Sequence, residues 1–383
     1  MTDKRRILFV NDEMEMGGVA RVLNTLMANL DRDKYDISLL VLHKRGMLLN
    51  EIPEGVKVYE GTPFFRAVDE SLPQLVKSGN IPALFAKVRL LFYMKTGLIK
   101  NKVVEERKKI FNETFDVEVA AKEGFCTVFT AYGDSKRKIN WVLTDYSVCN
   151  YSARHMGLVK EALEKIDLNI ADSKQALEAY MKVFDVDRGT AIHNLMDIDK
   201  VKRGLAEKHI EDNDALKIID VARFHPQKSI DRLIRAHKYV LDKGIDHDLY
   251  LIGGGEDEEM LHQLCAELKV EDTVHFLGFQ KNPYGDVKAC DLFVLSSLYE
   301  GFATIINESL IAGTPVLTTR VSGVEEQITE DDYGWIVEND QQNLNEGLYK
   351  ALSDREVLKK KKEALASYVY DNDAIIRRFE EVL

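Results

Sequence analysis

The chain has 383 residues, with 45% hydrophobic and 30% charged residues, a formal net charge of −12 and a pI near 5.4. This length predicts two globular domains, and the acidic balance argues against general nucleic-acid binding. No apolar run approaches the roughly 18 residues that cross a bilayer, and the apolar run at 7–10 is too short for a signal peptide. Four dispersed cysteines without a C-x-x-C pair predict reduced thiols in the cytoplasm: Cys126, Cys149, Cys265 and Cys290.

The first half of the chain alternates between strand and helix patterns. A buried strand is expected at the start, and Gly17-Gly18 opens an amphipathic helix. Further apolar strands are expected at 35–43, 115–122, 139–145 and 168–173. Alternation of this kind is typical of a parallel sheet with helices on both faces.

The pattern lapses near residues 191–199 and then restarts. The second half predicts strands at 216–224, 247–255, 272–279, 290–297 and 314–319, with helices between them. The sequence therefore predicts an α/β protein of two doubly wound, Rossmann-like domains, 1–192 and 193–370, followed by a capped terminal helix at 371–383. Two such sheets in tandem usually bind a ligand in the cleft between them.

An insert at about 64–111 interrupts the first domain. Its part from 87 to 109 carries eight positive and two negative residues, interleaved with apolar side chains. A basic amphipathic segment suits an anionic membrane surface, and its candidate contacts are Lys87, Arg89, Lys95, Lys100 and Lys102. The alternative is a pair of helices that cover the sheet, with solvated lysines.

The stretch "EGFATIINE" places Glu300 before Gly301 and Glu308 further along an expected helix. The backbone amides of Phe302, Ala303 and Thr304 would face out of the helix N-terminus and hold a phosphate or diphosphate. Beside that anion, Glu300 suits sugar hydroxyls. Glu308 is about 12 Å away by helical rise, which fits the ribose of a nucleotide. Either glutamate alone is more often a solvated helix residue.

Arg223 and Lys228 follow the first strand of the second domain and precede its helix. They are therefore expected at the carboxyl end of the sheet, where ligands bind. Two cations there would neutralise a diphosphate and stabilise it as a leaving group. Taken alone, the two residues also fit an ordinary solvated loop.

Other motifs are weak. The glycines of "IGGGEDEE" at 252–259 precede four acidic residues, which would repel a phosphate, so they predict a tight turn or close backbone approach. The nine histidines are dispersed and no H-E-x-x-H is present, so no metal site and no cofactor are predicted.

Five motifs together give the chain a family resemblance. They are "GGVARV" at 17–22, "VARFHPQKSIDRLI" at 221–234, "LIGGGEDEEML" at 251–261, "FLGFQKNPY" at 276–284 and "EGFATIINE" at 300–308. With them the chain resembles the retaining glycosyltransferases of family 4, which have the GT-B fold, and among these the bacterial capsule and surface-polysaccharide enzymes. The resemblance covers nearly all of the second half.

The resemblance implies roles for individual residues. Arg223 and Lys228 would bind the diphosphate of a nucleotide-sugar donor, Glu300 the transferred sugar and Glu308 the ribose. Gly17 and Gly18 would bring backbone of the first domain to the diphosphate. No metal would be required, and the leaving phosphate would take the acceptor proton during same-face attack. The acceptor would lie on the first domain, and the terminal helix would pack back onto it.

One position departs from the family. Related enzymes often have a histidine before Thr-Asp near the sugar, where this chain has Leu143, and Asp145 or His155 are candidates to substitute. The leading hypothesis is a retaining, metal-independent glycosyltransferase at the inner face of the membrane, with a UDP-sugar donor and a lipid-linked or polymer acceptor. Two alternatives stay open: a non-catalytic GT-B subunit that binds a partner transferase or glycan, and a sugar-nucleotide 2-epimerase.

Overall fold

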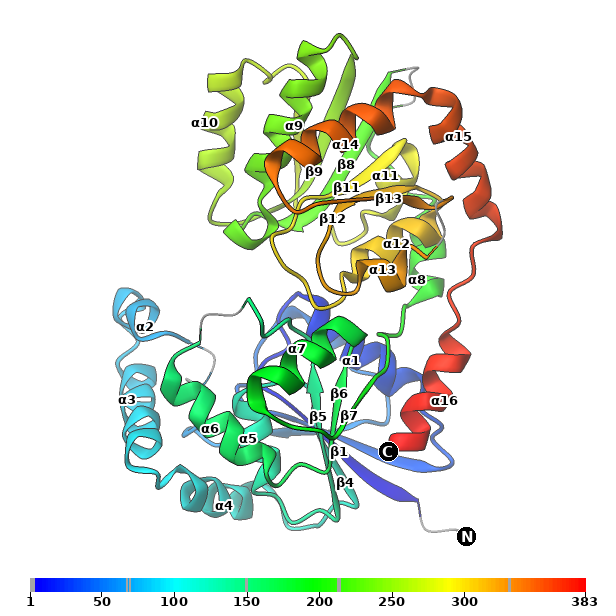
Figure 1. Ribbon diagram of the computed structural model, residues 1–383. Helices are drawn as coiled ribbons and strands as arrows, with labels where there is room; N and C mark the ends of the chain where they lie inside the picture. Colours follow the sequence, from blue (N-terminus) through cyan, green and yellow to red (C-terminus); the bar gives the residue numbers. More distant parts are fainter. Residues whose placement is uncertain (1–3, 67, 69, 149–150, 212–214, 330–331) are drawn as a thin grey trace. The chain divides into compact units, whose positions relative to one another are not determined.

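The computed structural model describes residues 4–383 apart from 67, 69, 149–150, 212–214 and 330–331. It divides into unit 1, Met1–Leu195 with Asn372–Leu383, and unit 2, Met196–Asp371 (Figure 1). The division at Leu195 lies three residues beyond the end of the predicted first domain at 192. The terminal helix belongs to unit 1, where Trp141 and Phe379 pack edge to face with ring centroids 5.1 Å apart.

Unit 1 contains a seven-stranded sheet in the order β3-β2-β1-β4-β5-β6-β7, and every recorded pairing is parallel. Its strands are β1 (Arg5–Asn11), β2 (Tyr35–Val41), β3 (Lys57–Glu60), β4 (Val117–Ala120), β5 (Arg137–Val142), β6 (Leu168–Ala171) and β7 (Gly189–Ala191). Its helical elements are α1 (Gly18–Asn29), the 3₁₀-helix η1 (Met47–Glu51), α2 (Leu72–Ser78), α3 (Ile81–Thr96), α4 (Ile99–Ile110), α5 (Phe125–Ala131), α6 (Ala153–Leu163), α7 (Lys174–Phe184) and α16 (Asn372–Val382).

Unit 2 contains a six-stranded sheet in the order β10-β9-β8-β11-β12-β13, again with parallel pairings. The strands are β8 (Leu216–Arg223), β9 (His247–Gly254), β10 (Val274–Gly278), β11 (Leu292–Leu295), β12 (Val316–Thr319) and β13 (Gly334–Val337). The helical elements are α8 (Ile198–Gly204), the 3₁₀-helix η2 (Pro226–Lys228), α9 (Ile230–Asp242), α10 (Glu258–Leu268), α11 (Tyr284–Ala289), α12 (Thr304–Ala312), α13 (Val324–Gln327), α14 (Gln341–Ser353), α15 (Arg355–Ala364) and the 3₁₀-helix η3 (Leu365–Ser367).

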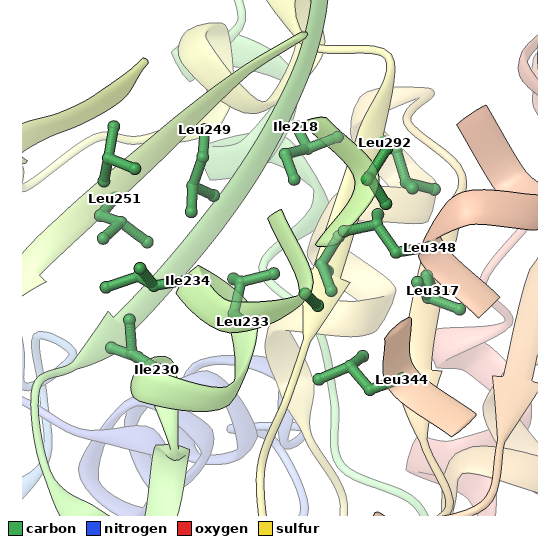
Figure 2. Close-up of a cluster of buried hydrophobic side chains, with 14 of the residues drawn as sticks. Ile218, Ile230, Leu233, Ile234, Leu249, Leu251, Leu292, Leu317, Leu344 and Leu348 are labelled. Atoms are coloured by element: carbon green, nitrogen blue, oxygen red, sulfur yellow. The ribbon is translucent and has the colours of Figure 1, made fainter. Parts of the chain in front are cut away.

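Helices cover both faces of the sheet in unit 2. On one face, Ile218 and Leu249 of the sheet meet Leu233 of α9 and Leu348 of α14 in one apolar cluster (Figure 2). On the other face, Phe293 of β11 packs with residues of α8, α11, α12 and α13. Parallel strands buried on both faces explain the continuous apolar runs in the sequence. The two sheets confirm the predicted α/β, doubly wound class.

Sequence analysis missed three strands, β3, β7 and β13, and all three lie at sheet edges. They are three or four residues long, and β3 and β7 contain no fully buried residue. An edge strand has one paired neighbour and need not be apolar, so no apolar run marks these segments.

Cys126, Cys265 and Cys290 are buried, whereas Cys149 lies outside the described residues. Within the described ranges, no helix combines the length and apolar character needed to cross a membrane.

Candidate functional site

The predicted donor residues of unit 2 gather where its strand order reverses. β8 and β11 are neighbours there, and the segments that follow them lead to opposite sides of the sheet. Arg223 is the last residue of β8 and is exposed; Lys228 ends η2 just after it; Glu300 follows β11. The structure therefore brings Lys228 and Glu300, 72 residues apart, to the carboxyl ends of adjacent strands.

Lys228 and Glu300 form an ion pair. Lys228 Nζ lies 2.5 Å from Glu300 Oε1, and the Ser297 hydroxyl donates to the same oxygen at 2.6 Å. The Lys228 and Glu300 side chains are 21% and 11% exposed, so the pair is partly shielded from water and still accessible. A shielded cation and carboxylate with accessible edges can hold a phosphate and a sugar hydroxyl, respectively.

The two loops that carry this pair are joined by hydrogen bonds to backbone carbonyls. Leu298 N donates to Gln227 O at 2.8 Å, and Gln227 Nε2 donates to Tyr299 O at 2.9 Å. Ser296 Oγ donates to Lys228 O at 2.9 Å. These bonds fix the loop after β8 against the loop after β11, so Lys228 and Glu300 are held in register before any ligand binds.

Arg232 and Asn339 brace the same loop from outside. Arg232 Nη2 donates to Ser296 O at 2.6 Å and to Asn339 Oδ1 at 2.8 Å, while Asn339 Nδ2 donates to Leu298 O at 2.9 Å. Sequence reasoning missed Ser297, Arg232 and Asn339. Arg232 lies inside the quoted motif at 221–234, but its contacts are with residues more than 60 positions away, which the sequence does not reveal.

The glycines at the end of β9 approach the end of β8 closely. A Cβ on Gly253 would lie 1.8 Å from Ala222 O, and one on Gly255 would lie 2.2 Å from Phe224 O. Gly253 also has a φ of +148°, which strains other residues. Glycine at these two positions therefore lets the end of β9 and the residue after it lie against the backbone next to Arg223.

The expected helix that carries Glu308 is α12, which begins at Thr304 with Ala303 as its N-cap. Phe302 and Ala303 precede the first helical residue, and each is 5% exposed. Because only 304–308 of the segment is helical, the helical rise does not give the separation of Glu300 and Glu308.

In unit 1, the corresponding reversal of strand order lies between β1 and β4. Lys122 Nζ lies 2.5 Å from Asp12 Oδ2 there. Burial works against the charge of Lys122, but Asp12 outweighs it and raises the pKa of that ammonium. Gly17 caps α1, which begins at Gly18, and a Cβ on either glycine would meet nothing within 4 Å. The sequence motif therefore lies at a helix start, as predicted.

The departure at Leu143 has a definite environment. Leu143 N donates to Glu123 Oε2 at 3.1 Å, and Asp145 Oδ1 accepts from the Ser147 amide and hydroxyl. His155 stacks on Tyr151, and burial lowers the pKa of its imidazole. Asp145 is therefore engaged in a local turn. The lowered pKa favours the neutral form of the His155 imidazole.

The predicted membrane cations of the insert fall into two groups. The structure does not support Lys102 as a membrane contact. Its side chain is 7% exposed, and its Nζ lies 2.8 Å from Glu105 and 2.7 Å from Glu106. Lys100 pairs with Glu161, and Lys87 donates to a backbone carbonyl. Arg89 and Lys95 are exposed on α3. A lysine buried among carboxylates cannot present its charge to a membrane surface.

A cavity of about 570 Å³ in unit 2 lies elsewhere, and its lining includes Lys200, Arg203, Phe279 and Gln280. None of the predicted donor residues lines it. In the part of the chain that the structure describes, no three His, Cys, Asp or Glu side chains gather as a metal site.

Comparison with known proteins identifies the class. Residues 202–371 match the family described as glycosyl transferases group 1. The chain is 28% identical over 375 residues, 94% of each protein, to the N-acetylgalactosamine-N,N'-diacetylbacillosaminyl-diphospho-undecaprenol 4-alpha-N-acetylgalactosaminyltransferase of Campylobacter jejuni. Two solved structures share the fold: HepE of Anabaena in complex with UDP (TM-score 0.70, 20% identity, 98% of each chain) and a TarM variant of Staphylococcus aureus in complex with UDP (TM-score 0.71, 13% identity, 99% of each chain).

The chain is a glycosyltransferase with the GT-B fold. The segment 202–371, which matches the glycosyl transferases group 1, carries Arg223, Lys228, Glu300 and Glu308. The recognition made from the sequence motifs is thereby confirmed, as is the enzyme class.

Proposed function

We propose that this glycosyltransferase transfers a sugar from a UDP-sugar, with retention of configuration, to a lipid-linked acceptor in the synthesis of a bacterial surface glycan. The observation that carries the proposal is the Lys228–Glu300 pair at the point where β8 and β11 diverge. The Campylobacter relative supports the acceptor and the stereochemistry, since its name specifies a diphospho-undecaprenol acceptor and an alpha linkage. HepE and TarM, which were crystallised with UDP, support the donor.

In the proposed reaction, Arg223 and Lys228 bind the donor diphosphate and Glu300 accepts hydrogen bonds from the transferred sugar. The bond between the anomeric carbon and the diphosphate oxygen breaks, and the acceptor oxygen bonds to that carbon from the same face. The acceptor proton passes to the departing diphosphate. Lys228 and Arg223 stabilise the charge that develops on the leaving group, so we expect the reaction to need no metal.

Two helix starts, one in each unit, are candidates to bind phosphate or nucleotide groups of the donor. Thr304 begins α12, so its amide lies at the positive, N-terminal end of the helix, where an anion is favoured. Gly301 and the segment through Ala303 lead into that helix, and Glu308 would accept from the ribose hydroxyls. Gly17 and Gly18 open α1 without side chains, so their backbone would be accessible to a phosphate.

We propose that the enzyme acts at the cytoplasmic face of the membrane, because α3 exposes an apolar stripe. Ile81, Phe85, Val88 and Phe92 are 75%, 64%, 52% and 58% exposed. Their spacing of four, three and four residues places them on one helical face. Arg89 and Lys95 of α3 are exposed as well. An apolar stripe with neighbouring cations fits the interface of an anionic bilayer, where a lipid-linked acceptor resides.

The membrane proposal has a direct test. We expect Phe85→Ser with Phe92→Ser to lower binding to vesicles of phosphatidylglycerol and phosphatidylcholine by more than tenfold, since each buried phenylalanine contributes about 1.5–3 kcal/mol. Val369→Ser, at an 82% exposed apolar position of unit 2, is the matched control. Unchanged vesicle binding in the double variant would remove the stripe from the membrane contact.

The donor proposal is tested by titrating the protein with UDP, GDP and ADP. We expect UDP to bind most tightly and Glu308→Ala to weaken UDP about tenfold, because a charge-assisted hydrogen bond to the ribose contributes about 1.5 kcal/mol. Glu346→Ala, at an exposed glutamate of α14, is the control. Unchanged UDP affinity in Glu308→Ala would remove the ribose assignment, and NMR of the product anomer would test retention.

A further inference from the structure

A buried carboxyl lies on β8 close to the donor loops. Asp220 is 2% exposed, three residues before Arg223 at the end of the strand. Among the residues that the structure describes, its Oδ1 has no hydrogen-bond partner. Its paired residue on β9 is Leu251, so the neighbouring strand offers no polar side chain at this level. The core of unit 2 therefore contains an incompletely compensated carboxyl directly beside the site.

Such a carboxyl has a strong preference for a proton. Transfer of an ionised carboxylate out of water is costly unless donors or cations compensate it, so burial favours the neutral acid. Burial raises the pKa of the Asp220 carboxyl to about 7, with the charge of Lys228 and the Val221 amide acting against the rise and the charge of Glu300 adding to it. Near neutral pH, Asp220 thus exists in both forms.

Among the described residues, the charged groups around this end of the sheet are the exposed Arg223 at the end of β8 and several groups that are engaged with one another. Lys228 contacts Glu300, and Arg232 of α9 donates to loop carbonyls and to Asn339. His225 Nε2 lies 3.4 Å from Glu256 Oε1. Lys228 and Glu300 are the two charged side chains that act on Asp220. A change in charge at Lys228 therefore changes the balance between the two forms of Asp220.

We propose that Asp220 is a positioning residue of the donor site, and that its carboxylate takes up one proton from solvent when a diphosphate binds at Lys228. The proposal rests on the donor role of Lys228 under the proposed function. A bound diphosphate brings negative charge to Lys228, so an ionised Asp220 would face a like charge and lose part of the compensation that Lys228 provides. Protonation removes that repulsion, and Lys228 then has one carboxylate fewer to compensate beside the diphosphate.

The sign of the pH dependence follows from this coupling. Because the complex binds more protons than the free protein, donor affinity falls as pH rises above about 7 and levels off once Asp220 is ionised in both states. The fall is about tenfold for each unit by which the bound diphosphate raises the pKa of Asp220. Donor release returns the proton to solvent.

The test is calorimetric titration of the full-length protein with UDP-glucose between pH 6.5 and 8.5, in buffers of different ionisation enthalpy. The diphosphate of UDP-glucose is a diester and does not titrate in this range, so it adds no protons of its own. We expect wild type to take up a substantial fraction of one proton and to lose about tenfold in affinity across the range. We expect Asp220→Asn to take up none and to bind UDP-glucose more tightly than wild type at pH 8.5.

Three outcomes are separable. No binding of UDP-glucose, UDP or GDP by wild type at any pH would overturn the proposed donor site itself. Binding by wild type without proton uptake would overturn the role of Asp220 and leave the donor site standing. A variant that is merely misfolded would bind more weakly at every pH, which a thermal melt would show, whereas Asp242→Asn, at an exposed aspartate of α9, should keep the wild-type profile.

Discussion

The donor loops of unit 2 and the helical insert of unit 1 both concentrate charged side chains, but they use them differently. In the donor loops, Lys228 and Glu300 stay accessible, and other hydrogen bonds to backbone carbonyls join the two loops. In the insert, Lys102 and Arg107 are buried: Lys102 pairs with Glu106 of its own helix, and Arg107 joins α4 to Glu118 of β4. A charge whose position is fixed by other bonds can serve a ligand, whereas a charge that forms the structural bond is committed to the fold.

Breaking the structural charge in the insert should have the largest effect on stability. Arg107 Nη2 lies 2.7 Å from Glu118 Oε1, and the Glu118 side chain is fully buried on β4. Arg107→Leu would leave this carboxylate without its cation, and we expect the free energy of unfolding to fall by about 3–5 kcal/mol in urea titrations. Burial raises the pKa of the Glu118 carboxyl although Arg107 opposes the rise, so the loss should become smaller as pH falls and a proton replaces the charge of Arg107.

The neighbouring Lys108 provides the matched control, since it lies on the same helix and is exposed. Lys108→Leu should change the unfolding free energy by no more than about 0.5 kcal/mol. Similar losses of unfolding free energy in Lys108→Leu and Arg107→Leu would mean that the buried Arg107–Glu118 pair does not stabilise the fold more than an exposed charge does.

Removing the functional charge should show the opposite pattern. We expect Lys228→Ala to lower kcat by about 100-fold or more, since the leaving diphosphate loses its main cation, while the unfolding free energy changes little. Lys238→Ala, at a lysine of α9 that pairs with Asp242 on the surface, is the control. Equal loss of turnover in the two variants would refute the assignment of Lys228.

Much of this contrast could be predicted from the sequence, and its limits have a physical cause. Arg223, Lys228 and Glu300 were predicted because they follow apolar runs, and strands end where ligands bind. Their contact across 72 residues depends on β8 lying beside β11, and strand order is not written in any local pattern. The same holds for Ser297, Arg232 and Asn339, whose polar side chains carry no sign of which carbonyls they reach.

The insert shows the converse limit. The sequence shows the net positive charge of the insert, but it does not show that Lys102 is buried and Lys95 is exposed. Lys102 turns toward Glu106 one helical turn away and is buried, whereas Lys95 stays in solvent near the end of α3. Burial depends on which face of α4 packs on the sheet, and the interleaved apolar residues of the insert are compatible with several faces. The apolar stripe on α3 was likewise not predicted as exposed.

The interior of unit 2 contains a buried pair of histidines, which should make the stability of the fold depend on pH. His237 Nδ1 lies 2.8 Å from His247 Nε2, and both residues are buried on α9 and β9. Burial and then the neighbouring histidines lower the pKa of His237 to about 3, and burial lowers that of His247. The unfolded chain therefore binds protons below about pH 6.5 that the folded chain does not, so stability falls as pH drops.

The expected loss from His237 is about 1.4 kcal/mol per pH unit, or about 2 kcal/mol between pH 6.5 and pH 5. Asp220 acts in the opposite direction, because burial raises its pKa to about 7 and the folded chain then holds a proton that the unfolded chain lacks. Urea unfolding of Asp220→Asn removes this offset and should show the full loss. Carboxylates with a lowered pKa, such as Asp286, reduce stability only as pH falls toward their unfolded value of 3.8 and contribute little in this window. Constant stability of Asp220→Asn from pH 6.5 to pH 5 would mean that the histidine pair accepts a proton inside the fold.

The smallest expected effect concerns Lys95, an exposed lysine of the insert, in contrast to the buried Lys102. Lys95→Gln removes an exposed cation near the apolar stripe of α3, and we expect binding to vesicles containing phosphatidylglycerol to weaken about fivefold, since each lysine near an anionic surface contributes about 1 kcal/mol. The loss should vanish in vesicles of phosphatidylcholine alone and shrink at high salt, because the attraction is electrostatic. Lys136→Gln, at an exposed lysine of unit 1 outside the insert, should leave binding unchanged. If Lys136→Gln weakens binding as much as Lys95→Gln, the exposed lysines of unit 1 attract the vesicle in general. The exposed charge of the insert would then have no specific role in membrane binding.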